Sequence, residues 1–108
     1  MPPVYWKDRV AFDEAKPAKA DLWRGDRLFA GLNCFLAGQA QLLHAHAGAD
    51  KFYLVLRGNG AFEVGGESFA AGPGALVPAA ADVAHAVRND GPEPLVVLTV
   101  IAPPPGRR

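Results

Sequence analysis

The chain has 108 residues, with 11 basic and 11 acidic side chains and a formal net charge of zero. This length supports one hydrophobic core rather than two, so we expect a single domain over residues 1–108. No basic run precedes Arg107 and Arg108, which argues against a phosphate-binding surface and so against nucleic acid as a partner.

The first part of the chain is expected to form an N-terminal arm and the first strands, over residues 1–26. Its only helical candidate is residues 13–20, which Pro17 interrupts. Residues 1–10 lack the apolar core of a signal peptide, and Cys34, the single cysteine, has no partner for an internal disulfide. Together these features predict a cytoplasmic protein.

From residue 28 onward, short apolar runs alternate with turn-forming residues, which is typical of an all-β sandwich or barrel. The expected strands are 28–36, 41–46, 51–57, 61–64, 67–70, 75–78, 85–88 and 95–101. Residues 28–49 carry no Asp, Glu, Lys or Arg, but glycines and polar side chains interrupt them, so we expect no membrane span. The barrel core is expected over residues 27–102, followed by a flexible, proline-rich tail at residues 103–108.

Turn chemistry and alternation predict details of this barrel. Gly65-Gly66 fits a two-residue hairpin turn, and residues 58–60 fit a longer hairpin. In residues 51–57, Phe52, Leu54 and Leu56 share one face, which we expect to meet a packed core. Lys51, Tyr53 and Val55 are expected to meet mixed surroundings. Residues 95–101 are apolar on both faces, which predicts cover on both sides, partly from a second subunit.

The three histidines of the chain provide the strongest functional signal. His44 and His46 are one residue apart in an expected strand, so both imidazoles should share a face, with Cα atoms about 6.5–7 Å apart. His85 opens a later expected strand. Three neutral imidazoles with free coordination positions are typical of a catalytic metal site, because structural sites are closed by four protein ligands. The pair at 44 and 46 alone also fits exposed strand histidines without a metal.

Two motifs surround these histidines. The first comprises Gly38, His44-Ala45-His46 and residues 50–58, and the second comprises Gly72-Pro73-Gly74, Pro78, His85 and Asn89. In this order and spacing they resemble the two conserved motifs of the cupin superfamily, and the chain looks like a small single-domain cupin. The resemblance implies a double-stranded β-helix, also called a jelly-roll β-barrel. It also implies a homodimer that pairs through edge strands.

The resemblance further implies one divalent metal ion (Zn, Fe, Mn, Ni or Cu) inside the barrel, with His44, His46 and His85 as ligands. Where the family's first motif usually supplies a glutamate ligand, this chain has Lys51. An ammonium has no lone pair and repels a cation, so we expect three protein ligands. Asp50 could add a fourth only if the preceding loop rotates the chain.

Several residues near the expected site have two interpretations. Lys51 is either a surface or salt-bridged lysine at the barrel mouth, or an inward group that attracts an anionic ligand. Tyr53 either donates a hydrogen bond to substrate or packs in the core with its hydroxyl at a rim. For Gln39 and Gln41, a solvated strand face is favoured over the cavity. Lys51 and Tyr53 are therefore the candidate catalytic residues.

The second motif departs from the family pattern in its spacing. His85 follows Pro78 by seven residues rather than the usual five or so. We interpret the difference as a two-residue insertion in the turn before the strand, and we expect His85 still to point inward.

The functional hypothesis is a small metal-binding cupin that acts as a metal-dependent enzyme on a small metabolite. An inward Lys51 would favour an anionic substrate, and the chemistry would be of isomerase, decarboxylase or dioxygenase type. One alternative is a non-catalytic module that binds or senses a small molecule, because a short chain has few loops for an elaborate site. A second alternative is a barrel whose histidines bind no metal because of Lys51.

Overall fold

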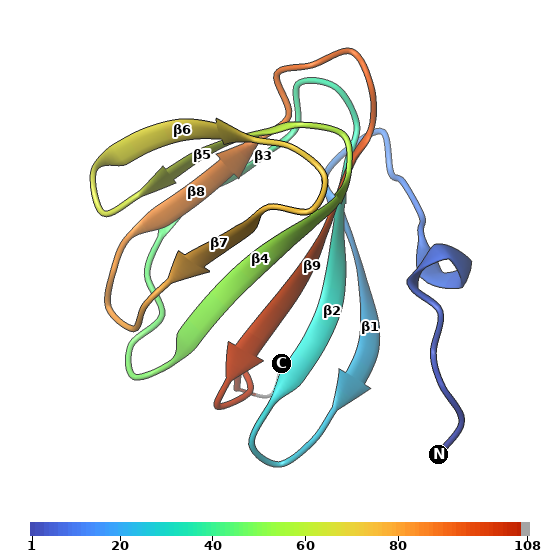
Figure 1. Ribbon diagram of the computed structural model, residues 1–108, viewed down its shortest axis with the longest axis vertical. Coiled ribbons are helices and arrows are strands. Elements are labelled where there is room, and N and C mark those ends of the chain that lie inside the picture. The colour runs from blue at the N-terminus through green and yellow to red at the C-terminus, as the bar shows by residue number, and fades with distance from the viewer. Residues whose placement is uncertain (107–108) are drawn as a thin grey trace.

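Two antiparallel sheets face each other in the computed structural model of the protein, which describes residues 1–106 (Figure 1). The five-stranded sheet contains, in spatial order, β1 (Ala18–Arg24), β2 (Phe29–Phe35), β9 (Leu95–Ala102), β4 (Asp50–Arg57) and β7 (Leu76–Ala79). The four-stranded sheet contains β3 (Ala40–His44), β8 (His85–Arg88), β5 (Gly60–Val64) and β6 (Glu67–Ala71). From β2 onward every connection except β5–β6 crosses between the sheets, so the predicted all-β jelly roll is confirmed.

The eight expected strands are all present, with ends that differ by at most two residues. The helical candidate at residues 13–20, which Pro17 interrupts, does not form a helix, because β1 begins at Ala18 and pairs with β2. The alternation of Ala20 and Leu22 with Lys19 and Asp21 is the signal for this strand: the apolar pair packs outside the barrel and the charged pair lines its interior.

Glycines serve two different connections. Gly65 and Gly66 join β5 to β6 with positive φ angles of 58° and 83°, and the predicted two-residue hairpin is confirmed. The longer hairpin expected at residues 58–60 is wrong, because β4 and β5 belong to different sheets. At this crossing Gly58 has a φ of 80°, and a Cβ there would lie 2.2 Å from the carbonyl oxygen of Pro94. The crossing therefore requires glycine.

The predicted orientation of β4 is also wrong. Lys51, Tyr53 and Val55 are 5%, 0% and 1% exposed and point into the barrel, whereas Phe52 and Leu54 lie half-buried on the outer face. The inner face carries the mixed residues because the barrel encloses a partly polar cavity at one end. On the outer face, Leu56 packs against the same cluster as the arm that precedes β1.

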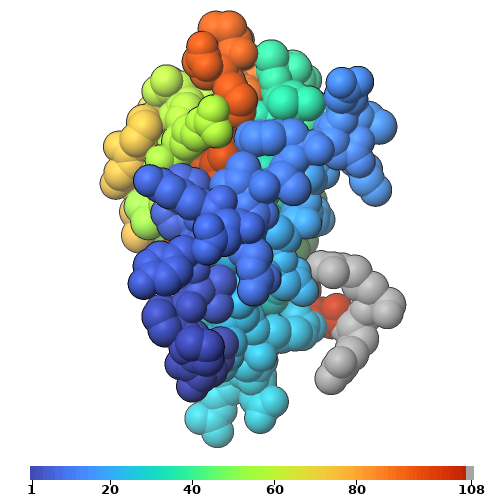
Figure 2. Space-filling view, turned by 90° about the vertical axis from the view of Figure 1, so that its right-hand side faces the viewer, coloured from blue at the N-terminus to red at the C-terminus, as the bar shows by residue number. Residues whose placement is uncertain are grey.

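This arm includes one short 3-10 helix, η1 (Trp6–Arg9), and lies over the outside of the five-stranded sheet (Figure 2). The arm residues in contact with the sheet cluster are Trp6, Val10 and Phe12, and the buried centre of that cluster is Leu32, Cys34 and Val96. Part of β9 is thus covered on both faces within one chain, by the arm cluster on one side and by the barrel interior on the other.

Among residues 1–106 no helix is long and apolar enough to cross a bilayer.

The interior divides into a packed end and an open end. The packed end consists of Phe35, Tyr53, Val55, Phe62, Val77, Val87, Leu95 and Val97. At the open end, Pro105 lines a cavity, and its carbonyl accepts a hydrogen bond from the Arg24 guanidinium. Residues 107 and 108 of the expected flexible tail lie outside the described residues.

Candidate metal centre

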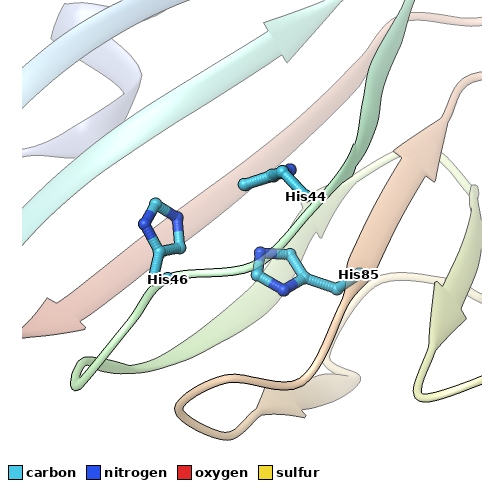
Figure 3. A group of neighbouring side chains, drawn as sticks. All are labelled: His44, His46 and His85. Carbon is cyan, nitrogen blue, oxygen red and sulfur yellow. The ribbon is translucent and has the colours of Figure 1, made fainter.

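The structure brings the three predicted histidines together at the junction of β3 and β8. His44 is the last residue of β3 and is the cross-strand partner of His85, the first residue of β8. His46 lies two residues beyond the end of β3, in the loop to β4, so it does not share a strand with His44 as predicted. The ring centroids are 4.3 Å apart for His44 and His85, 5.0 Å for His44 and His46, and 5.6 Å for His46 and His85 (Figure 3).

The backbone sets the tautomer of two of these rings. Nδ1 of His44 lies 2.7 Å from the carbonyl oxygen of Leu42, and Nδ1 of His85 lies 3.0 Å from that of Val83. Because a carbonyl oxygen only accepts, both Nδ1 atoms carry the proton and donate it. Each Nε2 is then left with a free lone pair, which is the usual arrangement of a metal-ligating histidine.

His85 provides the most direct indication that a further group belongs here. It is 1% exposed, and within residues 1–106 its Nε2 is a buried atom without a hydrogen-bond partner. Such an atom costs free energy unless something satisfies it. One possible ligand atom from each of the three histidines lies within 4.8 Å of the others, and three nitrogens bound to one ion at about 2.1 Å lie about 3.0–3.6 Å apart. Side-chain shifts of roughly an ångström would therefore let the three imidazoles share an ion.

The surroundings of His46 and His85 disfavour the protonated form of these two rings. Burial, opposed by the hydrogen bond to the Val83 carbonyl and assisted by the nearby positive charge of Lys51, lowers the pKa of His85 to about 4. Burial also lowers the pKa of His46, and Lys51 adds to the effect. A neutral imidazole is the form that binds a metal, so these two rings need not lose a proton first at neutral pH.

The long turn before β8 holds the two ligand segments together. Asp82 adopts a φ of 68°, and its N–H donates to the carbonyl oxygen of His46 at 3.0 Å. The N–H of Gly65 donates to the carbonyl oxygen of Ala84 at 2.9 Å, which fixes the end of the turn against the β5–β6 hairpin. The residues interpreted as an insertion thus tie the His46 loop to the start of β8, and His85 points inward.

The structure does not bring Asp50 to this cluster. Its side chain is exposed, and Oδ1 accepts a hydrogen bond from the N–H of Ala81 at 2.9 Å. The strand is regular at this point, so Asp50 and Lys51 point to opposite faces. Among the described residues, the group that could hold a metal consists of His44, His46 and His85.

Lys51 lies inside the barrel, so its interpretation as a surface residue is wrong. Its Nζ is 4.5 Å from the centroid of the Tyr53 ring, and its side chain lines the cavity. Burial, and then the positive charge of Lys19, lower the pKa of Lys51 to about 8. In the described part of the chain the only ion pair joins Arg88 and Asp90, so no carboxylate neutralises Lys51.

The Tyr53 hydroxyl is already engaged within the protein. The residue is 0% exposed, burial raises its pKa, and its hydroxyl donates to Oε1 of Gln41 at 2.5 Å. Gln41 lines the cavity, contrary to the favoured solvated position, because β3 turns this residue inward before its bulge. Gln39 instead accepts from the N–H of Leu36 and donates to the carbonyl of Asp13.

The cavity next to the histidines has a volume of about 290 Å³, and sequence reasoning missed four of its polar residues, Lys19, Asp21, Asn33 and Thr99. Lys19 and Asp21 were missed because no strand face was assigned within residues 1–26. Asn33 and Thr99 lie in runs that are otherwise apolar, and Asn33 Nδ2 donates to Thr99 Oγ1 at 2.6 Å. The available signal for Asn33 and Thr99 was a polar residue at an inward-facing position of a strand that is otherwise apolar.

Comparisons with known proteins agree with this architecture. A family model described as the cupin domain matches residues 32–101. The crystal structure of TT1209 from Thermus thermophilus is 35% identical, with 97% of this chain and 100% of that chain covered and a TM-score of 0.94. An RmlC-like cupin protein from Desulfovibrio desulfuricans is 27% identical, with coverage of 97% and 99% and a TM-score of 0.85.

A more distant neighbour is the structure of KdgF from a Halomonas species, which shares 22% identity, 85% and 83% coverage and a TM-score of 0.80. At that identity the likeness concerns the fold alone. No curated protein matches the chain.

Proposed function

The chain belongs to the cupin domain family, and from this premise we propose that it is a metal-dependent enzyme acting on a small molecule. The single observation that carries the proposal is the buried, unpartnered Nε2 of His85, which lies in one cluster with His44 and His46. Among the described residues no other group satisfies this Nε2. A shared cation would account for three imidazoles lying so close together inside the barrel.

His44, His46 and His85 would hold one divalent cation, and imidazole ligands suit Zn, Cu, Fe and Ni. A cation held there with open coordination positions would supply Lewis-acid polarisation of a substrate oxygen. The carbonyls of Leu42 and Val83 hold two of the rings in the ligating tautomer. The adjoining cavity of about 290 Å³ gives a small molecule access to His44 and His46, which both line it.

Metal analysis tests this proposal directly. Protein purified without a histidine tag is expected to contain about one divalent ion per chain by elemental mass spectrometry. The variants His46→Ala and His85→Ala should lose it. Asp50→Ala is the matched control and should keep it, because that side chain lies outside the cluster. Less than about 0.2 ion per wild-type chain, not restored by added divalent ions, would overturn the metal site.

A non-catalytic binding or sensing role is the second candidate. It is favoured by the Tyr53 hydroxyl, which is buried and bonded to Gln41 rather than directed to a ligand. Incubating metal-loaded protein with keto acids, cysteine analogues and phenolic acids separates the two roles. Consumption of any compound supports an enzyme, and the products distinguish isomerase, decarboxylase and dioxygenase chemistry. A raised melting temperature without consumption supports the binding module.

A further inference from the structure

We propose that the cavity contains an anion subsite, built on Lys51 with Lys19, that binds the carboxylate of a small organic acid. The proposal deepens the proposed function. It rests on that function only in placing the end of the ligand opposite the carboxylate near His44 and His46. The subsite itself is carried by side chains on β1, β2, β4 and β9.

The first observation is an ammonium that is buried without a counter-charge. Lys51 is 5% exposed, and its cross-strand neighbours are Ile101 on β9 and Ala79 on β7, both apolar. The adjacent carboxylate, Asp50, points to the opposite face and bonds Ala81. Lysines are almost never buried unless they are paired. Since no carboxylate of the described chain forms an ion pair with Lys51, and Lys51 lines the cavity, a ligand is the natural source of a partner anion.

The second observation is a polar wall next to Lys51. Lys19 is the cross-strand partner of Asn33, and Thr99 is the partner of Tyr53. Asn33 donates to Thr99 Oγ1, so the Thr99 hydroxyl keeps its own proton available for an acceptor in the cavity. Gly31 lies opposite Thr99 and adds no side chain that would fill this wall.

The charges that face the cavity favour a single negative charge. The two ammonium groups of Lys19 and Lys51 are opposed by the carboxylate of Asp21, which also lines the cavity. The other titratable groups nearby are the three imidazoles and the phenol of Tyr53. Without a bound metal, the charged lysine and aspartate side chains of this lining sum to about one positive charge. One carboxylate neutralises it, whereas a phosphate dianion would exceed it.

Size and polarity narrow the ligand further. A volume of about 290 Å³ corresponds to roughly ten water molecules and so to a ligand of about ten non-hydrogen atoms. The lining also includes Phe29, Ile101 and Pro105, which suits a short hydrocarbon skeleton. The ligand is thus a small acid with its carboxylate at Lys51, its carbon skeleton against Phe29 and its far end toward His44.

Isothermal titration calorimetry on the full chain after chelator treatment tests the subsite without the metal. The probes are benzoate and hexanoate, each compared with its neutral amide, and inorganic phosphate. Each acid should bind at least about tenfold more tightly than its amide to the wild type. Lys51→Met should abolish this preference and Lys51→Arg should keep most of it. Lys19→Met should weaken acid binding by about two- to fivefold, since Lys19 is exposed.

Lys7→Met is the matched control, because it removes the same charge from the outer arm, and it should leave the preference unchanged. Equal binding of acid and amide, absence of acid binding, or a preference that survives Lys51→Met would each overturn the subsite. Tighter binding of phosphate than of both acids would overturn the assignment to carboxylates. Elemental analysis of the same preparations before chelator treatment reports on the metal site separately. Absence of metal at that stage, together with a retained acid preference, counts against the proposed function alone.

Discussion

Replacing Lys51 with methionine is expected to make the protein more stable. Burial and the charge of Lys19 lower the pKa of this lysine from its ordinary 10.5 to about 8. At about 1.4 kcal/mol for each pH unit, the folded state loses ~3 kcal/mol of stability by keeping the ammonium charged. The contact with the Tyr53 ring, which methionine replaces only in part, offsets some of this. We therefore expect Lys51→Met to raise the free energy of unfolding by about 2 kcal/mol, or roughly 10 °C in melting temperature.

The pH dependence of this gain follows from the direction of the pKa change. Below pH 8 the lysine is charged in both the folded and the unfolded chain, so the folded state carries the full cost. Between about pH 8 and 10.5 the folded lysine is neutral while the unfolded one still binds a proton, and wild-type stability rises relative to the variant. The advantage of Lys51→Met should therefore be largest at pH 7 and shrink toward pH 10.

Urea unfolding at pH 7 and pH 10 provides the measurement. Wild type, Lys51→Met and the exposed-site control Lys7→Met are compared, so that the titration of all other groups cancels in the differences. Lys7→Met should change stability by less than about 0.5 kcal/mol. A Lys51→Met protein that is no more stable than wild type at pH 7, or whose advantage is the same at pH 10, would refute the reasoning.

Four further predictions concern other parts of the molecule. The metal-free protein should lose stability as the pH falls from 6.5 to about 4, because His85 takes up a proton in the unfolded chain but stays neutral when buried in the folded one. Thermal denaturation of His85→Gln should show a smaller loss of stability over this range. Gly58→Ala should cost about 2–4 kcal/mol in urea unfolding, since its Cβ would meet the backbone of Pro94, whereas Gly38→Ala, with a similar φ but open space, should cost only about 1 kcal/mol. Asn89→Ala should cost about 2–3 kcal/mol by the same assay, because its buried amide donates to the carbonyls of Phe35 and Glu93. The homodimer stays a prediction, and sedimentation equilibrium should give twice the chain mass of 11.4 kDa.

Much of the candidate site could be predicted because its residues carry their own signal. Histidines are rare in this chain, and His44, His46 and His85 all belong to motifs with glycines and prolines at turn positions. Lys19, Asn33 and Thr99 carry no such signal, because a lysine, an asparagine or a threonine in a strand is ordinary. They become a site only through strand pairing, which places β1 beside β2, and β9 between β2 and β4.

The sequence by itself determined the positions of the strands from residue 29 onward and the hairpin at Gly65-Gly66. Apolar alternation and positive φ angles depend on neighbouring residues alone. Only the tertiary structure decided that Lys51 points inward, because either face of β4 could meet apolar partners until the second sheet and the N-terminal arm were in place. The same holds for the crossing at Gly58, where the partner of β4 lies some forty residues further along the chain. Contacts between distant segments, and not local preference, set both outcomes.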